Sequence, residues 1–284
     1  DITERKRAEE RIAKLNRLYA TLSGINTAIV RAASPAELFD RVCEVAIEHG
    51  RFSMAWIGTI DPANRMVTPV AQRGLSPDNI TLIRDSIGQS AQGLGHTATS
   101  IRDRRIIYTN DYDAEGAVTA WHAEAVKLGI HGSATLPIKQ GGEIVGVLKL
   151  YVRERHFFDP EQLTLLEEMT MDVSYALDRF DTAAKKTQAE AALRDSEEIF
   201  RSINAAAQDA VILIDNEGRL ACWNPAAELI LGYRADEALG QEMHRLIAPA
   251  RHLPAYAKGF AAFRSSGEGP VIGKSFETEA RCKD

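Results

Sequence analysis

Apolar side chains recur every three or four positions along the first thirty residues, which is the spacing of one face of a helix. They are Ile12, Leu15, Leu18, Tyr19, Leu22, Ile25 and Ile29, with charges packed between them at the start. The sequence Ser34-Pro35-Ala36-Glu37 then combines an N-cap serine, a first-turn proline and a glutamate that closes a capping box. The pattern predicts a helix over 2–32 and a second helix that ends at Gly50.

After Gly50 the spacing of apolar residues changes from that of a helix to that of strands. Strands are predicted over 52–60, 66–71, 106–109, 133–139 and 143–152. The last two are joined by Gly141-Gly142, a dipeptide suited to a tight hairpin turn. Helical segments are predicted over 97–104 and 117–128, and the pattern between the second strand and residue 97 is mixed. The elements indicate an α+β fold.

A very long helix follows these strands. Asp159-Pro160-Glu161-Gln162 repeats the capping signal, and the helix extends from Pro160 to about Ala206, with a break near Thr182 as an alternative. Its second half is rich in alanine and charge. A helix of this length without internal breakers indicates a coiled coil or a rod between domains. A solvated linker helix without a partner chain is the alternative interpretation.

A second pattern of strands and helices follows Ala207. Strands are predicted over 210–215 and 219–223, on either side of a turn. Asn224-Pro225 caps a short helix that ends at Gly232. A helix over 251–264 and a strand over 271–280 complete the prediction.

The composition excludes several classes of protein. With 284 residues and 45% hydrophobic content, the chain can form one large domain or two ordinary ones. A formal net charge of −6 argues against nucleic-acid binding, which needs a clustered basic face. No apolar run approaches the roughly 20 residues of a membrane helix, and the start lacks both a signal core and an initiator methionine. We expect a cytoplasmic piece of a longer protein, without direct membrane contact.

Residue types that carry catalysis are sparse. The three cysteines, Cys43, Cys222 and Cys282, are too few for a disulfide framework and wrongly spaced for zinc. The seven histidines are scattered without metal-ligand spacing, so we expect no metal site. Walker-type, HExxH and GxSxG motifs are missing, as are GGDEF and EAL signatures and a histidine-kinase phospho-acceptor box. No enzyme is expected in this piece.

Most of the first 180 residues resemble a GAF domain of bacterial multi-domain sensors. The resemblance rests on "LSGINTAIVRAASPAELFDRVCEVAIEHGRFSMAWIG", "IIYTNDYD", "GSATLPIKQGGEIVGVLKLY" and "FDPEQLTLLEEMTMDVSYALD", which follow one another in the right order. It implies an antiparallel sheet of about six strands flanked by helices, with the two terminal helices packed together on one face.

The remainder resembles the start of a PAS domain. The strings are "LRDSEEIFRSINAAAQDAVILIDNEGRLACWNPAAELILGY" and "LIAPARHLPAYAKGFAAFRSSGEGPVIGKSFETEARCKD", and the last two strands of the PAS sheet are missing. The first eleven residues resemble the exit of a preceding PAS domain. We therefore expect an incoming helix over 1–21, a GAF-like domain over 22–180, a helical linker over 181–200 and a truncated PAS-like domain over 201–284. The parent would be a sensor histidine kinase or a GGDEF/EAL protein.

The resemblance also bears on cofactors. Bilin-binding GAF domains use a cysteine after the central strands, and no cysteine lies between residues 50 and 180. The flavin-adduct motif NCRFLQ is missing from the PAS-like segment. The axial position of haem-binding PAS domains falls near Tyr256, one turn after His252. Covalent bilin, a flavin adduct and haem are therefore not expected, and no cofactor is predicted.

The GAF resemblance implies a small-molecule pocket between the sheet and the segment covering one face. The candidate lining residues are Trp56, Tyr108, Asn110, Asp111, Trp121, His122, Ser133 and Thr135. Aromatic walls with a few polar groups suit a small ligand. The alternative is that the two tryptophans are ordinary core and that the polar residues make turns. One enzymatic GAF class reduces free methionine sulfoxide with cysteine thiols, but Cys43 alone is better interpreted as a buried structural residue.

We expect a mechanical mode of action. Two chains would pair in parallel through the helices at 2–32 and 160–206, and a change in the GAF pocket would alter the register or rotation of that helical rod. The rod would pass the change to the PAS domain and to an output domain in the same chain. A ligand-free dimerisation scaffold is the alternative, and a GAF-type methionine sulfoxide reductase is a second one.

Overall fold

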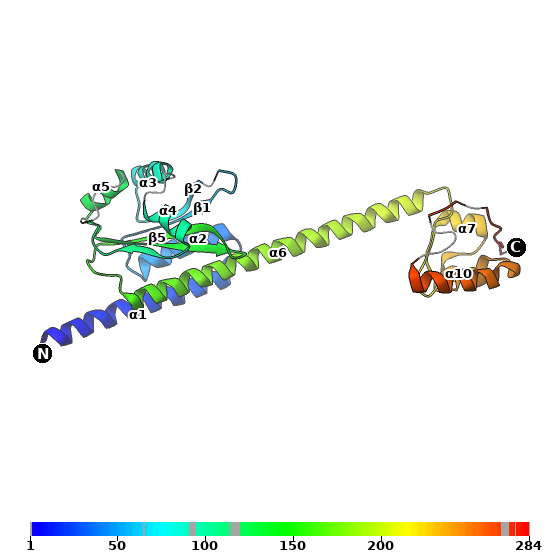
Figure 1. Cartoon of the computed structure of the whole chain (residues 1–284), viewed down its shortest axis with the longest axis horizontal. Coiled ribbons are helices and arrows are strands. Elements are labelled where there is room, and N and C mark those ends of the chain that lie inside the picture. Colours follow the sequence, from blue (N-terminus) through cyan, green and yellow to red (C-terminus); the bar gives the residue numbers. More distant parts are fainter. Residues whose placement is uncertain are drawn as a thin grey trace. The chain divides into compact units, whose positions relative to one another are not determined.

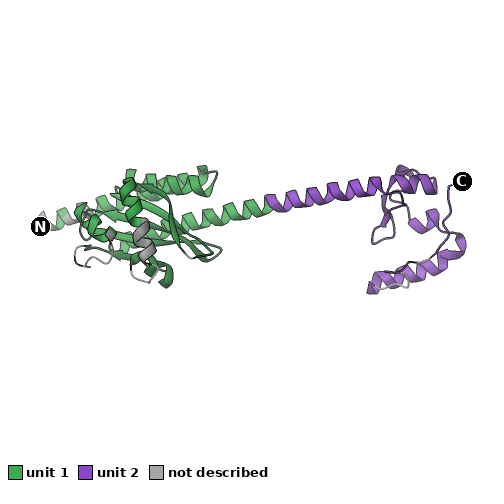
Figure 2. Ribbon diagram, turned by 90° about the horizontal axis from the view of Figure 1, so that it is seen from above, with its two compact units in different colours: residues 1–186 green, residues 187–284 purple. Residues whose placement is uncertain are grey.

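The fold was analysed in a computed structural model that describes residues 2–64, 66–90, 95–112, 114, 120–267, 273–275 and 277–283. The chain divides into two compact units, residues 1–186 and 187–284, shown in green and purple in Figure 2. Each unit has its own hydrophobic core. The predicted α+β fold class is confirmed.

The first unit begins with two helices, α1 (Ile2–Arg31) and α2 (Pro35–Glu48). The predicted capping of α2 is present, because the Ser34 hydroxyl accepts a hydrogen bond from the Glu37 amide at 3.2 Å. The Glu37 carboxylate accepts from the Ala33 amide at 2.9 Å, one residue before the N-cap. The amides of Ala33 and Glu37 are thereby satisfied where the chain enters α2.

Ser34→Ala is expected to lower the free energy of unfolding of the first unit by about 1 kcal/mol, because an N-cap hydrogen bond is lost. Ser34→Gly should lower the free energy of unfolding by only a few tenths of a kcal/mol, because glycine leaves the Glu37 amide open to water. Urea unfolding measures both. Ser23→Ala, at an exposed position within α1, is the matched control and should leave the stability unchanged or slightly higher.

A five-stranded antiparallel sheet forms the centre of this unit, in the order β2-β1-β5-β4-β3. The strands are β1 (Met54–Ile60), β2 (Val67–Arg73), β3 (Ile107–Thr109), β4 (Gly132–Gln140) and β5 (Glu143–Val152). The resemblance implied about six strands, so the described part of the chain has one fewer. Gly141 and Gly142 both take positive φ in the β4–β5 hairpin, as the turn requires.

Helices α1, α2 and the first part of α6 (Pro160–Ala206) cover one face of the sheet. Their apolar side chains share one core with alternate residues of the central strands, among them Ile57, Leu136 and Leu148. The expected packing of the two terminal helices on one face is therefore present (Figure 1).

Helices α3 (Pro77–Ser90), α4 (His96–Asp103) and α5 (Ala120–Lys127) lie on the other face (Figure 1). Two of them match the helical segments predicted over 97–104 and 117–128, although residues 117–119 lie outside the described residues. Helix α3 was not predicted. Its signal was nevertheless present, because Ser76-Pro77 repeats the Ser-Pro start of α2 and the Ser76 hydroxyl accepts from the Asn79 amide at 3.2 Å.

Helix α6 is continuous over 47 residues and has no break at Thr182. The Asp159 carboxylate accepts from the amides of Glu161 and Gln162 at 2.9 and 3.1 Å, which confirms the predicted start. The helix begins in the first unit and ends in the second. One unbroken element therefore belongs to both units.

The second unit contains a two-stranded sheet, β6 (Ile212–Ile214) and β7 (Leu220–Trp223). Helices follow it in the order α7 (Pro225–Leu231), α8 (Ala235–Ala238), α9 (Met243–Ile247), the 3₁₀ turn η1 (Ala250–His252) and α10 (Leu253–Ser266). The short helices α8 and α9 were not predicted. Asn224 caps α7, with its Oδ1 accepting from the Ala227 amide at 2.9 Å.

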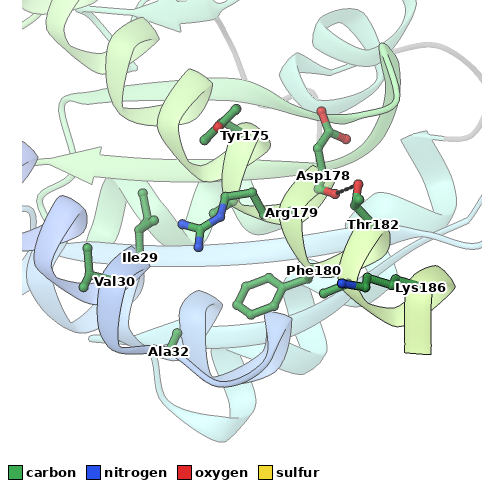
Figure 3. Close-up of a pocket in the computed structure, with 11 residues that line it drawn as sticks. Ile29, Val30, Ala32, Tyr175, Asp178, Arg179, Phe180, Thr182 and Lys186 are labelled. Carbon is green, nitrogen blue, oxygen red and sulfur yellow. Dashed lines mark hydrogen bonds between the residues drawn. The ribbon is translucent and has the colours of Figure 1, made fainter. Parts of the chain in front are cut away.

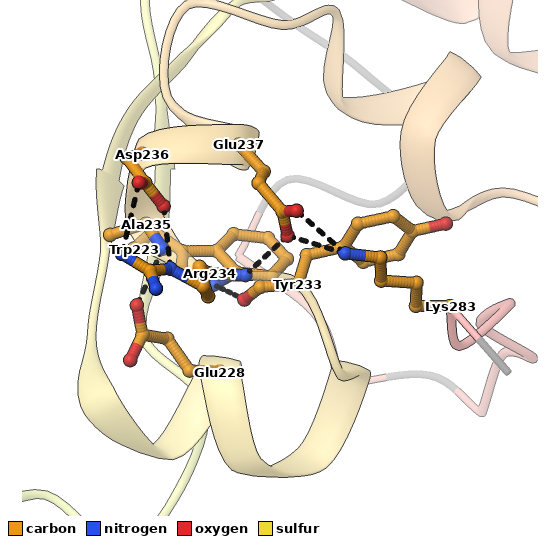
Figure 4. Close-up of polar contacts among 8 residues, drawn as sticks. All are labelled: Trp223, Glu228, Tyr233, Arg234, Ala235, Asp236, Glu237 and Lys283. Atoms are coloured by element: carbon orange, nitrogen blue, oxygen red, sulfur yellow. Dashed lines mark hydrogen bonds and ion pairs between the residues drawn. The ribbon is translucent and has the colours of Figure 1, made fainter.

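The strand predicted over 271–280 is wrong where the structure describes it. Residues 273–275 and 277–283 form no strand, and Val271, Ile272 and Phe276 lie outside the described residues. Instead, the Lys283 amide donates to the Leu231 carbonyl at 3.0 Å and its ammonium pairs with Glu237 at 2.6 Å (Figure 4). A strand needs a partner ladder, and the described backbone contacts of this segment are single hydrogen bonds to the carbonyls of Ile247 and Leu231, which lie in or at the ends of helices.

Candidate functional site

Polar side chains occupy two adjacent rows across the centre of the first unit's sheet. Residues that face one another on antiparallel strands project from the same face. The first row joins Thr135 on β4, Lys149 on β5 and Trp56 on β1, and the second joins Ser133, Tyr151 and Met54. On β2 the first row continues to Gln72. We call the six residues on β4, β5 and β1 the polar rows.

These rows are covered rather than open to solvent. Ser133 and Thr135 are 0% exposed and Lys149 is 6% exposed. The hydroxyls of Ser133 and Thr135 are buried without a hydrogen-bond partner in the described part of the chain. Burial of a hydroxyl without a partner costs about 1–3 kcal/mol, so an ordinary core would carry apolar residues here.

The aromatic side chains around the rows are joined by hydrogen bonds. The Tyr151 hydroxyl accepts from the indole of Trp121 at 2.8 Å and from the indole of Trp56 at 3.3 Å. Burial raises the pKa of Tyr151 well above 10, against the lowering effect of the two indole hydrogen bonds. The phenol is therefore neutral and keeps its proton.

Two histidines approach the same face from the covering helices. Burial lowers the pKa of His96 on α4 to about 4, with smaller contributions from Lys149 and His122. His122 on α5 stacks on Tyr112 with ring centres 4.3 Å apart, and its Nε2 lies 2.6 Å from the Tyr112 carbonyl oxygen. His96 is therefore neutral at physiological pH, and Lys149 is the basic residue within the polar rows.

The structure brings five of the eight candidate lining residues to this face. Trp56, Ser133 and Thr135 belong to the polar rows, while Trp121 contacts the rows through Tyr151 and His122 lies beside Trp121 on α5.

The other three lie elsewhere. Tyr108 is 45% exposed, with its ring near Phe158. Asn110 exchanges two hydrogen bonds with the Phe158 backbone at 2.7 and 2.8 Å, and Asp111 pairs with Arg155 at 3.3 Å. These side chains hold the loop before α6.

Sequence reasoning missed Lys149, Tyr151 and His96. The signal for Lys149 was a single charge in the otherwise apolar residues 144–152 of β5. Both faces of this central strand are covered, so alternation does not mark the side to which a residue points. Only the pairing register shows that Lys149 and Thr135 share a row.

Cys43 lies on the opposite side of the sheet, on α2, and is 0% exposed. Burial raises the pKa of its thiol to about 12. Such a thiol is almost wholly protonated and is a poor nucleophile. The geometry does not favour the reductase alternative.

A surface groove of about 610 Å³ lies between the end of α1 and the middle of α6. Figure 3 shows Ile29 and Val30 of α1 lining it together with Arg179 and Phe180 of α6. Further along α6, Leu193, Phe200 and Ile203 are 62%, 47% and 66% exposed. These helices therefore present apolar side chains that their own chain does not cover.

Among the residues that the structure describes, no group of three or more His, Cys, Asp or Glu side chains is arranged to hold a metal ion. No helix among them combines the length and apolar character needed to cross a membrane.

Two family models match the chain. The GAF domain model matches residues 32–178, just over half of the chain. The model of the PAS fold matches residues 198–277. Among curated proteins, an uncharacterized protein of Azorhizobium caulinodans is 32% identical over 89 residues. That match covers 31% of this chain and only 12% of the relative's length.

Several solved structures are similar to the first unit at low identity. A free methionine-R-sulfoxide reductase from Neisseria meningitidis is 13% identical, with 58% of this chain and 91% of that chain covered and a TM-score of 0.47. The GAF domain of an Acinetobacter phosphoenolpyruvate-protein phosphotransferase is 14% identical, covering 60% and 98%, with a TM-score of 0.46. A domain of a sensor histidine kinase protein from Sinorhizobium meliloti is 16% identical, covering 55% and 99%, with a TM-score of 0.44.

Proposed function

The chain belongs to the GAF domain family, and because a PAS fold follows its GAF domain we propose that it is a sensory module of a longer signal transduction protein. The GAF domain would bind a small ligand at the polar rows and relay binding through α6. The output domain would be a histidine kinase or a cyclic-di-GMP enzyme further along the same protein.

The observation that carries ligand binding is the burial of Ser133, Thr135 and Lys149 on one sheet face. The two buried hydroxyls of Ser133 and Thr135, which have no partner among the described residues, lower the stability of the unliganded fold. A bound ligand that satisfies them recovers this free energy. The site is therefore suited to a fold whose stability and conformation change on binding.

Native mass spectrometry of the purified chain tests this step. A defined extra mass, retained under gentle conditions and lost on Lys149→Met, supports ligand sensing at the polar rows. If no small molecule is retained from cells and no metabolite extract shifts the unfolding temperature, the ligand-free scaffold is the better description.

The relay would pass through a parallel dimer of α6. Leu193 and Phe200 are one heptad apart, and Ile203 follows three residues later. When Leu193 and Phe200 are placed at heptad position a and Ile203 at position d, Lys185 falls at position g. Glu190 then falls at position e of the next heptad. In a parallel dimer these two positions pair across the chains. The opposite charges favour a second copy in register as the occupant of this surface.

Charge reversal provides the test. Lys185→Glu and Glu190→Lys are each expected to weaken the dimer about tenfold, because two symmetric attractions become repulsions. The double variant should restore wild-type affinity. Sedimentation equilibrium of the whole chain measures these constants. Asp195→Lys, at position c away from the partner, is the matched control and should change little.

Two outcomes would contradict the dimeric relay. One is a monomer at every concentration tested. The other is a double variant as weak as either single reversal, because parallel register demands that the two reversals compensate each other.

A further inference from the structure

We propose that the ligand of the polar rows is an uncharged molecule with at least one carbonyl group, whose oxygen accepts hydrogen bonds from the hydroxyls of Ser133, Thr135 and Tyr151. This inference rests on the proposed function and specifies the chemical class of the ligand. It follows from the hydroxyl groups that still have a hydrogen atom to donate, from their placement, and from the lack of charge among them.

Ser133 and Thr135 place two such hydroxyls on the sheet side of the site. Both are wholly buried and have no hydrogen-bond partner among the described residues. The two residues are two positions apart on β4, so their side chains project from the same face of the sheet, about 6.5–7 Å apart. Hydrogen bonds of about 2.8 Å to each hydroxyl fill most of that span, so one small polar group fits between them.

Tyr151 places a third hydroxyl on the side of the covering helices, where it meets Trp121 of α5. A phenol oxygen accepts two hydrogen bonds and donates one. The indoles of Trp56 and Trp121 both donate to this oxygen, and within the described part of the chain its O–H donates to no group. Burial raises the pKa of Tyr151 well above 10, so the proton stays in place. Tyr151 is therefore a donor only, and the ligand must supply the acceptor.

The groups around this acceptor carry no charge. The three hydroxyls are neutral, and so is His96 on α4, because burial lowers the pKa of that histidine to about 4. Lys149 already takes part in an interaction of its own, so the selection of a ligand falls to the hydroxyls. Burial of an ionised group among neutral hydroxyls costs far more free energy than burial of a hydrogen-bonded carbonyl. The site therefore favours a neutral acceptor over a carboxylate, a phosphate or an ammonium group.

A carbonyl group matches these hydroxyls among neutral groups. Its oxygen has two lone pairs and no hydrogen atom, whereas an N–H group of a ligand only donates and would leave the Tyr151 proton without an acceptor. The indole and phenol surfaces of Trp56, Trp121 and Tyr151 suit a flat or apolar body attached to the carbonyl. Uncharged ketones and amides combine these two features.

Isothermal titration calorimetry of the whole chain tests the class with matched probes at constant ionic strength. Acetophenone is compared with ethylbenzene, which has nearly the same shape but no carbonyl oxygen, and benzamide is compared with benzoate, which adds a charge. Acetophenone is expected to bind about tenfold or more tightly than ethylbenzene, and benzamide more tightly than benzoate. The inference is overturned if ethylbenzene binds as tightly as acetophenone, if benzoate binds as tightly as benzamide, or if neither carbonyl probe binds.

Variants locate the binding on the polar rows. Thr135→Val keeps the side-chain volume and should lower the preference for acetophenone over ethylbenzene below about threefold, while ethylbenzene itself binds as before. The variant should also raise the unfolding temperature of the unliganded first unit by about 2–4 °C, because a buried hydroxyl without a partner is removed. Thr68→Val, at an exposed position of β2, is the control and should leave the preference unchanged. An unchanged preference in Thr135→Val, or a lower unfolding temperature, would show that this hydroxyl serves the fold rather than a ligand.

The two proposals fail in different ways. If a molecule retained by the native protein proves to be an ion, ligand sensing stands and the assignment to an uncharged carbonyl compound falls. If no probe binds and no cellular molecule is retained, ligand sensing at this face falls with it.

Discussion

Asn224→Ala is expected to lower the free energy of unfolding of the second unit by about 3 kcal/mol or more. The Asn224 side chain is 1% exposed and makes four hydrogen bonds. Its Oδ1 accepts from the amides of Val211 and Ala227, both at 2.9 Å. Its Nδ2 donates to the carbonyls of Asn204 at 3.2 Å and Asp209 at 2.9 Å. Truncation leaves all four backbone groups without this partner.

The same substitution should loosen the end of α6, because Asn204 lies in its last turn. Amide hydrogen exchange read by mass spectrometry is expected to show faster exchange over residues 200–211. Urea unfolding followed by Trp223 emission gives the stability. Asn216→Ala, at an exposed turn position, is the matched control and should change the stability by less than about 0.5 kcal/mol.

Asn224→Asp separates the two roles of this residue. The carboxylate still accepts from the two amides, but it cannot donate to the carbonyls of Asn204 and Asp209. If this variant equals the wild type in stability and exchange, Asn224 only caps α7 and does not couple α6 to the second unit.

The pattern of side chains predicted most of the regular structure, because the capping signals and periodicities are local. Helix α6 and the β4–β5 hairpin were placed within a residue or two. Helix α3 was missed although its Ser76-Pro77 start and the spacing of Ile80 and Ile83 are local signals of the same kind. The strand expected over 271–280 depended on a partner strand, and no local pattern reveals whether a partner is available.

The candidate site was predicted less completely, for a physical reason. Trp56 and Thr135 are distant in sequence and meet only through β5, so their neighbourhood depends on the strand register. Asn110 and Asp111 were expected beside them because the GAF resemblance implies a pocket between the sheet and the segment that covers one face. Their side chains instead hold the loop around Phe158. A turn changes the direction of the chain, so nearness in sequence does not carry over to the site.

Cys43 is expected to react with a thiol reagent at least about a thousandfold more slowly than Cys282 in the native protein at neutral pH. A pKa of about 12 leaves only a trace of thiolate, and the side chain is fully buried, whereas Cys282 is exposed. Thiolate reacts and thiol does not, so both effects slow the same step. Time-resolved mass spectrometry of iodoacetamide labelling separates the three cysteines.

The pH dependence of the labelling rate, with an unfolded control, tests whether Cys43 can take part in thiol-based reduction. The rate at Cys43 should rise about tenfold per pH unit through the alkaline range while the fold persists, because the pKa lies above that range. In denaturant all three cysteines should react alike. A fast reaction at native Cys43 would mean a reachable thiolate, and thiol-based reduction would again be a candidate activity. A slow reaction would count against covalent chemistry at Cys43 and would leave the proposed ligand binding at the opposite sheet face as the activity to test.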